Sequence, residues 1–270
     1  MNFQQVIITG GSSGIGKAIA KLLVQEGSNL FLIARNAIKL DEAKLELELE
    51  KKYPEQKILT YAADVSDRLQ IEQAMSYAIN TMGVPDLLIT SAGIAKPDYF
   101  QNLSIEVFER TMAVNYFGSL YCLMSVTKSM NKKGKGQIVL LSSGAGLMGF
   151  YGYSAYSPSK FAVRGLAESL RGELKLSNIY LSVVYPPDTN TPQLEEENKT
   201  KPPETKAITA TAKIWSAEDV AQKILQGIKK KAFIITPGLE MSFLARFHSL
   251  LFEPLNFYFD RIVGQVRSER

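Results

Sequence analysis

The sequence predicts an α/β protein: a Rossmann-type, doubly wound parallel sheet of about seven strands, in a single domain with a C-terminal amphipathic extension. Short runs rich in Val, Ile and Leu alternate with longer amphipathic stretches, which is typical of parallel strands covered by helices on both faces. The first run also leads through a glycine-rich loop into a helical pattern, as in dinucleotide-binding domains. A chain of 270 residues with 46% hydrophobic residues can bury a core of this size.

The predicted elements alternate along most of the chain. Each strand is a short apolar run, and each helix carries apolar residues three and four positions apart. The predicted strands are 5–9, 29–34, 57–63, 86–90, 137–142, 179–185 and 232–235, and the predicted helices are 15–26, 38–52, 68–80, 105–131, 155–176 and 217–229. We expect a catalytic domain over residues 1–240 and an amphipathic segment over 241–270.

A glycine-rich loop over residues 9–16 joins the first strand to the first helix. Glycines let the backbone approach a phosphate closely, and the N-terminus of a helix attracts anions. The sequence therefore predicts a dinucleotide pyrophosphate site, because the loop follows a strand and opens a helix. The residues expected to contact the cofactor here are Gly10, Ser12, Ser13, Gly14, Ile15 and Gly16.

Arg35 follows the second strand directly. An acidic residue at this point bonds the ribose 2′-hydroxyl of NAD, whereas an arginine accommodates the 2′-phosphate of NADP. Arg35, with a hydroxyl added by Ser12, therefore favours NADP(H) as the cofactor.

Ser143, Tyr156 and Lys160 are the candidate catalytic residues. Tyr156 and Lys160 are four positions apart and share one face of a predicted helix, while Ser143 follows the end of a strand. The lysine charge should lower the tyrosine pKa from about 10 toward neutrality. A serine that holds a carbonyl oxygen and a tyrosine that donates a proton are suited to ketone reduction or alcohol oxidation.

Two regions break the alternation of strands and helices. Residues 186–213 are proline-rich and then highly charged, and they follow a strand end, where ligands bind in such sheets. We expect a mobile flap over the substrate there, with a plain surface insertion as the alternative. Residues 241–263 form an amphipathic helical pattern with a wide apolar face, expected to be kinked or broken at Pro254. That face could pack on the domain, on a second subunit or on a lipid interface.

Composition narrows the function classes. A net charge of +4, with no basic stripe interleaved with aromatic residues, gives no support for nucleic-acid binding. Cys122 is the single cysteine, so no internal disulfide can form, and with His248 as the single histidine we expect no metal site. The N-terminus shows no leader pattern, and no apolar run approaches the ~18 residues of a spanning helix. We therefore expect a cytoplasmic protein.

Over about residues 3–235 these motifs resemble the short-chain dehydrogenase/reductase family. The resemblance implies that Asn115 completes a tetrad with Ser143, Tyr156 and Lys160. In that mechanism the tyrosine protonates the carbonyl, the serine positions it, the lysine bonds the nicotinamide ribose, and Asn115 holds a water. The cofactor contacts that the resemblance adds are Asp64, Val65, Ala92, Gly93, Tyr156, Lys160, Pro186, Thr189 and Thr191. Ser91 and Pro187 depart from the family pattern, which has asparagine and glycine there, so we expect a stiffer nicotinamide-side loop.

Residues 185–205, and residues 161–168 after the lysine, resemble one group in this family, the 3-ketodihydrosphingosine reductases. That resemblance implies NADPH-dependent reduction of the 3-keto group of a long-chain sphingoid ketone. The alternative is a reductase of another lipophilic ketone, such as a 3-oxoacyl thioester, a retinoid or a steroid. The family also implies a homodimer or homotetramer. Peripheral contact with a membrane through residues 241–263 is a further expectation, and in a eukaryote the membrane would be the cytosolic face of the endoplasmic reticulum.

Overall fold

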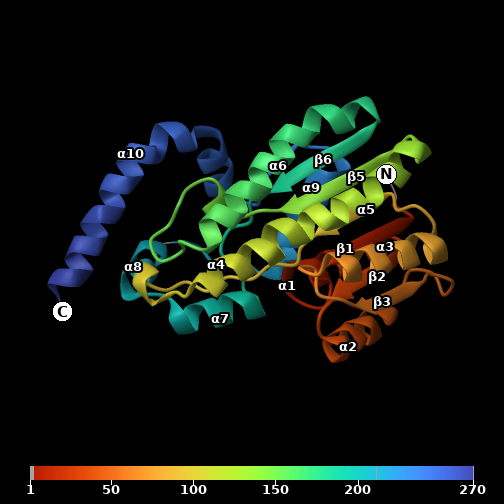
Figure 1. The fold of residues 1–270 in the computed structure, drawn as a ribbon, viewed down its shortest axis with the longest axis horizontal. Helices are drawn as coiled ribbons and strands as arrows, with labels where there is room; N and C mark the ends of the chain where they lie inside the picture. The colour runs from red at the N-terminus through yellow and green to blue at the C-terminus, as the bar shows by residue number, and fades with distance from the viewer. Residues whose placement is uncertain (1–2, 211, 270) are drawn as a thin grey trace.

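Seven parallel strands form one sheet in the order β3-β2-β1-β4-β5-β6-β7 (Figure 1). The computed structural model describes residues 3–210 and 212–269. The chain leaves β1 toward β2 and β3 on one side and returns to build β4 to β7 on the other. The strand order therefore reverses between β1 and β4, which is where ligands bind in doubly wound sheets. The predicted fold class is confirmed.

The strands are β1 (Gln5–Thr9), β2 (Asn29–Ala34), β3 (Ile58–Ala62), β4 (Leu87–Thr90), β5 (Gly136–Leu141), β6 (Ile179–Val184) and β7 (Ile234–Ile235). The α-helices are α1 (Gly14–Gln25), α2 (Ala37–Glu48), α3 (Arg68–Met82), α4 (Ile105–Met112), α5 (Gly118–Lys133), α6 (Tyr156–Leu176), α7 (Pro192–Thr200), α8 (Pro203–Thr209), α9 (Ala217–Lys229) and α10 (Leu239–Ser268). Short η elements lie at Phe100–Asn102 (η1), Ala113–Phe117 (η2, a π-helical turn) and Gly144–Gly146 (η3).

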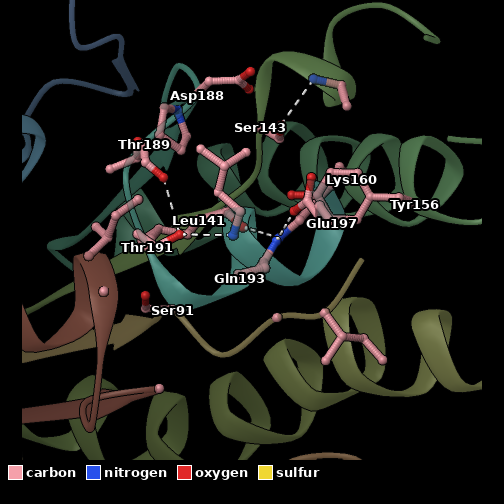
Figure 2. Close-up of a pocket in the computed structure, with 18 of the residues that line it drawn as sticks. Ser91, Leu141, Ser143, Tyr156, Lys160, Asp188, Thr189, Thr191, Gln193 and Glu197 are labelled. Atoms are coloured by element: carbon pink, nitrogen blue, oxygen red, sulfur yellow. Dashed lines mark hydrogen bonds between the residues drawn. The ribbon is translucent and has the colours of Figure 1, made fainter. Parts of the chain in front are cut away.

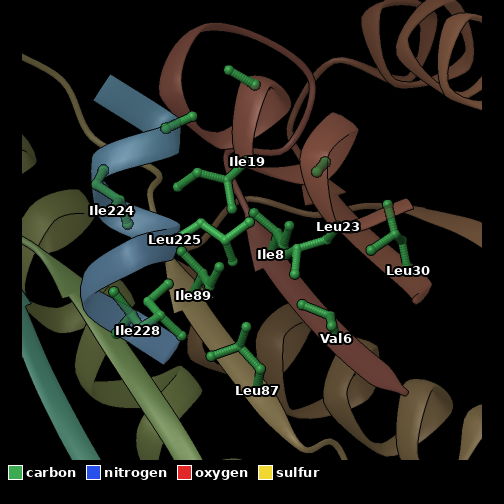
Figure 3. Close-up of a cluster of buried hydrophobic side chains, with 14 of the residues drawn as sticks. Val6, Ile8, Ile19, Leu23, Leu30, Leu87, Ile89, Ile224, Leu225 and Ile228 are labelled. Carbon is green, nitrogen blue, oxygen red and sulfur yellow. The ribbon is translucent and has the colours of Figure 1, made fainter. Parts of the chain in front are cut away.

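Two apolar layers cover the sheet. Successive residues of a strand point to opposite faces, so Val6 and Ile8 of β1 belong to one layer and Ile7 to the other. Helices α1 and α9 supply the first layer, where side chains such as Ile19 and Ile224 are completely buried against the strands (Figure 3). Helices α3, α5 and α6 supply the second layer. The sheet is thus rigidly held on both faces, and loops at its carboxyl edge have a fixed base.

The predicted helix over 38–52 is too long, since α2 ends at Glu48. Pro54 disfavours helical backbone at the residue before it. The side chain of Gln56 also accepts the backbone N–H of Tyr53 at 2.7 Å, in place of a helical carbonyl.

The segment 186–213 is more regular than expected, because it holds α7 and α8; residue 211 of the expected flap lies outside the described residues. The Thr191 side chain accepts the Leu194 N–H at 3.3 Å and caps α7, and Pro192 and Pro203 occupy first turns of these helices, where proline costs no hydrogen bond.

Helix α10 continues through Pro254, so of the kink or break expected there the break does not occur. Pro254 removes only one N–H, and exposed surface lets the helix bend around the lost bond. Figure 1 shows α10 at one end of the molecule, changing direction along its length, with the C-terminus far from the sheet. It lies against α8 and η3.

Candidate active site

A cleft of about 570 Å³ opens at the carboxyl edge of the sheet, above the switch point. Loops after each of the strands β1 to β6 line it, and α7, α8 and α10 close its outer side. Figure 2 shows side chains from these separate elements converging on one space.

The glycine-rich loop shapes one end of this cleft. Gly10 has a φ of +68°, and a Cβ there would lie 2.7 Å from the Ala92 nitrogen. Gly14 has a φ of +52° and opens α1, with Ser12 and Ser13 beside it in the cleft wall. Such a glycine cradle at a helix N-terminus fits a pyrophosphate. Gly16 serves another purpose, because it does not line the cleft and a Cβ there would lie 2.4 Å from the Gly10 carbonyl oxygen.

A basic corner lies next to this cradle. Arg35 and Ser12 both line it, as the sequence predicts, and so does Lys39. Sequence reasoning missed Lys39, although it lies four residues after Arg35 in the first turn of α2. Asn36 caps that turn by accepting the Lys39 N–H at 3.0 Å, which fixes the start of the helix beside the cleft.

Asp64 and Val65 differ in their position relative to the cleft. Val65 lines the cleft, whereas Asp64 is held at its rim by Arg110, with 2.5 Å between the carboxylate and the guanidinium. Burial raises the pKa of Asp64, but hydrogen bonds from Arg110 and Ser66 outweigh burial and lower the pKa below its usual value. The Asp64 side chain therefore binds protein groups, and the cleft wall here is apolar.

The loop after β4 forms the next part of the wall. Ala92, Gly93 and the departing residue Ser91 all line the cleft. The Ala92 N–H donates to the Thr9 hydroxyl at 3.3 Å, which ties this loop to the end of β1. Replacement of the family asparagine by Ser91 therefore leaves the wall in place.

Ser143, Tyr156 and Lys160 come together at the floor of the cleft (Figure 2). Ser143 follows β5 and accepts the Ala145 N–H at 3.1 Å, which starts η3. Tyr156 and Lys160 occupy the first turns of α6, and the Lys160 ammonium lies 5.5 Å from the centroid of the tyrosine ring. Lys160 donates to the Leu141 carbonyl at 3.0 Å. The predicted spacing thus places the three polar groups in one buried site.

The pKa of Tyr156 shifts opposite to expectation. Burial raises it well above its usual value, and the negative charge of Glu197 raises it further, while hydrogen bonds with the Ser143 and Gln193 side chains lower it. Burial also lowers the pKa of Lys160 to about 8. Desolvation thus outweighs the attraction between lysine and phenolate, because both groups leave water together. The site therefore holds a protonated phenol beside an ammonium group that loses its proton more readily than an exposed lysine does.

Asn115 lies in the π-helical turn η2, a kind of irregularity that often marks functional sites. Its side chain bonds the backbone N–H and carbonyl of Ile94 and donates to the Ser159 hydroxyl at 2.9 Å. Asn115 and Lys160 flank Gly93 from two sides, each about 3.5 Å from where a Cβ would lie (3.4 and 3.5 Å). The fourth predicted residue is therefore near the lysine, behind the wall of the cleft.

The loop after β6 supplies the remaining predicted residues. Pro186, Thr189 and Thr191 line the cleft, together with the departing Pro187. The Thr189 hydroxyl donates to the Pro187 carbonyl at 2.8 Å, and the Thr191 hydroxyl donates to the Thr189 carbonyl at 3.2 Å. This loop is held by its own hydroxyl groups.

Sequence reasoning missed a polar cluster beside Tyr156. Glu197 of α7 accepts hydrogen bonds from the Tyr153 hydroxyl at 2.7 Å and from the Gln193 amide at 2.8 Å. The two α7 residues are four positions apart, but that spacing has meaning only once the segment is known to be helical.

The outer end of the cleft is apolar. Phe150, Leu194, Ile208, Met241 and Leu244 line it, from four different segments. Among the residues that the structure describes, no cluster of His, Cys, Asp or Glu is arranged to hold a metal ion. No described helix is long and apolar enough to cross a membrane.

An anion cradle and a buried tyrosine and lysine share one cleft at the switch point of a doubly wound sheet, and together they define a dinucleotide-dependent oxidoreductase. The chain belongs to the short chain dehydrogenase family, whose sequence pattern matches residues 4–202.

Two relatives with the same name are similar to most of this chain. The 3-ketodihydrosphingosine reductase of Bos taurus is 44% identical over 222 residues, covering 82% of this chain and 67% of that protein. The 3-ketodihydrosphingosine reductase of Dictyostelium discoideum is 40% identical, covering 92% of this chain and 82% of that protein.

Solved structures share the fold. The crystal structure of levodione reductase has a TM-score of 0.78 at 25% identity, covering 86% of this chain and 95% of that chain. The structure of ElxO with NADP bound has a TM-score of 0.76 at 26% identity, covering 87% of this chain and 97% of that chain.

Proposed function

We propose that this protein is an NADPH-dependent reductase of the 3-keto group of 3-ketodihydrosphingosine. The observation that carries the proposal is the position of the Tyr156 hydroxyl, buried at the floor of a cleft with an anion cradle at one end and an apolar wall at the other. The relatives named as reductases of this ketone support the substrate.

The cradle residues and the basic corner would hold the cofactor. The pyrophosphate fits at the start of α1 beside Ser13 and Gly14, and Arg35 and Lys39 supply two positive charges for a 2′-phosphate. Val65 and Ala92 would offer apolar surface to the adenosine, and Thr191 would contact the nicotinamide. When bound, NADPH supplies the hydride for the carbonyl carbon.

The chain's own residues handle the proton. Tyr156 donates it to the carbonyl oxygen as general acid, and Ser143 bonds the same oxygen and orients it. Lys160 places its positive charge below the tyrosine ring, which favours the phenolate that remains after transfer. Asn115 positions the loop after β4 and, through it, the surroundings of Lys160.

The apolar end of the cleft accommodates the hydrocarbon chain. Phe150, Ile208 and Leu244 offer it a wall, and each buried methylene contributes about 0.8 kcal/mol. A reductase of another lipophilic ketone, such as a 3-oxoacyl thioester, a retinoid or a steroid, remains the alternative. Dependence of activity on chain length and headgroup separates these substrates.

NADPH oxidation tests this function directly. With 3-ketodihydrosphingosine in detergent we expect turnover that prefers NADPH to NADH, because Arg35 and Lys39 favour a 2′-phosphate. A 3-oxoacyl thioester of equal chain length should be a poorer substrate. Turnover of the thioester alone would reject the sphingoid assignment.

Tyr156→Phe tests the proposed acid. The variant should lose at least about 100-fold in kcat, since general acid catalysis typically contributes 10²–10⁴-fold. NADPH binding, measured by nicotinamide fluorescence, should persist because the cradle is untouched. Full turnover in this variant would assign the acid to another group.

We further propose that residues 1–240 form the catalytic domain, with Met241 and Leu244 completing its cleft wall, and that 241–263 contact a membrane surface peripherally, from the cytoplasmic side. Leu239, Phe243, Phe247, Leu250 and Phe257 recur on one side of α10 and are all exposed. A homodimer or homotetramer built on α5 and α6 is the expected assembly, and exposed apolar side chains there, Met124 and Phe161 among them, support it.

A further inference from the structure

A buried carboxylate shares the cleft with Tyr156. Glu197 lines the cleft and its side chain is nearly enclosed, with the residue 8% exposed. Figure 2 shows Glu197 and Gln193 on the same side of the site as Tyr156 and Lys160. Gln193 hydrogen-bonds both the Tyr156 hydroxyl and the Glu197 carboxylate, so a single amide separates the two.

Both carboxylate oxygens of Glu197 act as hydrogen-bond acceptors. One oxygen accepts from the Tyr153 hydroxyl and the other accepts from the Gln193 amide. A carboxylate offers about four lone-pair positions, and these two donors occupy only two of them. Two acceptor positions therefore remain for a group that enters the cleft.

Within the described ranges 3–210 and 212–269, no Lys or Arg forms an ion pair with Glu197, although its charge attracts the Lys160 ammonium. Lys201 is buried nearby, but its ammonium lies over the Tyr153 ring, 6.0 Å from the centroid, and forms no ion pair with Glu197. Burial raises the pKa of Tyr153 and of Tyr156, and the negative charge of Glu197 raises both further, while the same charge only partly offsets the lowering of the Lys160 pKa by burial. A buried carboxylate without a direct ion pair is costly, so a ligand that places a cation against its oxygens would be favoured.

We propose that Glu197 binds an ammonium group of the substrate, carried on the carbon next to the carbonyl that is reduced. The substrate class is thus a long-chain α-amino ketone, and the inference rests on the proposed function. In 3-ketodihydrosphingosine the amine sits on carbon 2, beside the 3-keto group. With the carbonyl oxygen bound at the Tyr156 hydroxyl, this amine is on the carbon next to the carbonyl and would face the Glu197 carboxylate.

Glu197 would then determine specificity as well as affinity. A neutral ketone of the same length would leave the buried carboxylate unpaired, and sites built to bond a polar group reject analogues that lack it. Tyr153 and Gln193 act as positioning residues, because they hold the carboxylate from both sides.

The wild-type enzyme gives the first test. We would compare kcat/KM for 3-ketodihydrosphingosine and for 1-hydroxyoctadecan-3-one, which has the same chain without the amine. We expect a preference of about 10- to 100-fold for the amino ketone, the range for hydrogen bonds to a charged group. Equal kcat/KM values would overturn the inference and leave the proposed function standing. Failure to reduce either ketone would reject both.

Glu197→Gln gives the second test, with Glu196→Gln as the matched control. Glu196 is the preceding residue, is exposed, and pairs with Lys199 outside the cleft. In Glu197→Gln the ratio of kcat/KM between amino and deamino ketone should fall at least about tenfold, mainly through KM, while Glu196→Gln keeps the wild-type ratio. An equal fall for both ketones, with the ratio unchanged, would show a merely structural role and overturn the inference.

Discussion

The two central residues, Tyr156 and Lys160, differ most from what their types and spacing predict. The sequence places an ammonium beside a phenol and predicts a lowered tyrosine pKa. In the folded chain both groups are buried, and the loss of water disfavours the charged form of each. The phenol therefore stays protonated at neutral pH, which suits an acid that must begin each reduction with its proton.

Lys160 should set the upper pH limit of ketone reduction. Burial lowers its pKa to about 8, so its positive charge is present below pH 8 and is lost as the pH rises through that value. With the raised pKa, Tyr156 keeps its proton over the same range. We expect kcat/KM to be flat below pH 7.5 and to fall toward about tenfold per unit above pH 8.5.

The measurement uses saturating NADPH and the deamino ketone, so that no amine of the substrate titrates. A profile that stays flat to pH 10 would contradict the prediction. Enzyme stability at each pH is checked by returning samples to pH 7 before a second assay.

Among the elements, α1 depends on the glycine-rich loop in two separate ways. Gly10 and Gly14 adopt positive φ and shape the cradle, whereas Gly16 lets the helix approach the end of β1. The sequence motif predicts the glycines as a group, but only the structure separates the two roles.

Gly16→Ala should destabilise the fold and weaken NADPH binding together. Its Cβ would lie 2.4 Å from the Gly10 carbonyl oxygen, a backbone atom that cannot move without shifting the cradle. We expect the free energy of unfolding in urea to fall by ~1–3 kcal/mol, the usual cost of overpacking, and NADPH affinity to fall with it.

Gly172→Ala on α6 is the control, since a Cβ there meets no atom within 4 Å. That substitution should leave cofactor affinity unchanged and stabilise the helix by roughly 0.5–1 kcal/mol. Equal stability of the Gly16 and Gly172 variants would refute the close-approach role of Gly16.

At the scale of the whole molecule, α10 joins the outer wall of the cleft to an exposed apolar stripe. Met241 and Leu244 line the cleft, whereas Leu250 and Phe257 are 77% and 75% exposed. The far end of the helix is tied down by Arg267, which bonds the Tyr151 hydroxyl at 2.9 Å. A substrate with a long hydrocarbon chain would therefore enter beside an apolar surface.

The double variant Leu250→Glu and Phe257→Glu should lose binding to phospholipid vesicles in a flotation assay, because it places two charges on the stripe. Leu49→Glu with Leu176→Glu is the matched control, since both leucines are exposed elsewhere, at 89% and 93%. Wild type and control should float with vesicles. Unchanged flotation of the double variant would remove the membrane role, and a smaller particle in gel filtration would assign the stripe to a subunit contact.

The sequence by itself determined the doubly wound sheet, the glycine-rich cradle and the grouping of Ser143, Tyr156 and Lys160. Strand and helix periodicity and the order of short motifs are local properties, and local chemistry is enough to predict them. All but one of the predicted strand boundaries agree with the structure to within a single residue for the same reason.

Only the tertiary structure decided the direction of the pKa shifts, the helical form of 192–209, and the position of Glu197 beside Tyr156. Each depends on burial or on contact between segments far apart in the chain. A sequence pattern carries no measure of how much water a group loses. The prediction from sequence therefore counted only the charge of Lys160, which lowers the pKa of Tyr156, whereas desolvation raises that pKa. It also could not show that an acidic stretch after β6 turns one of its glutamates inward.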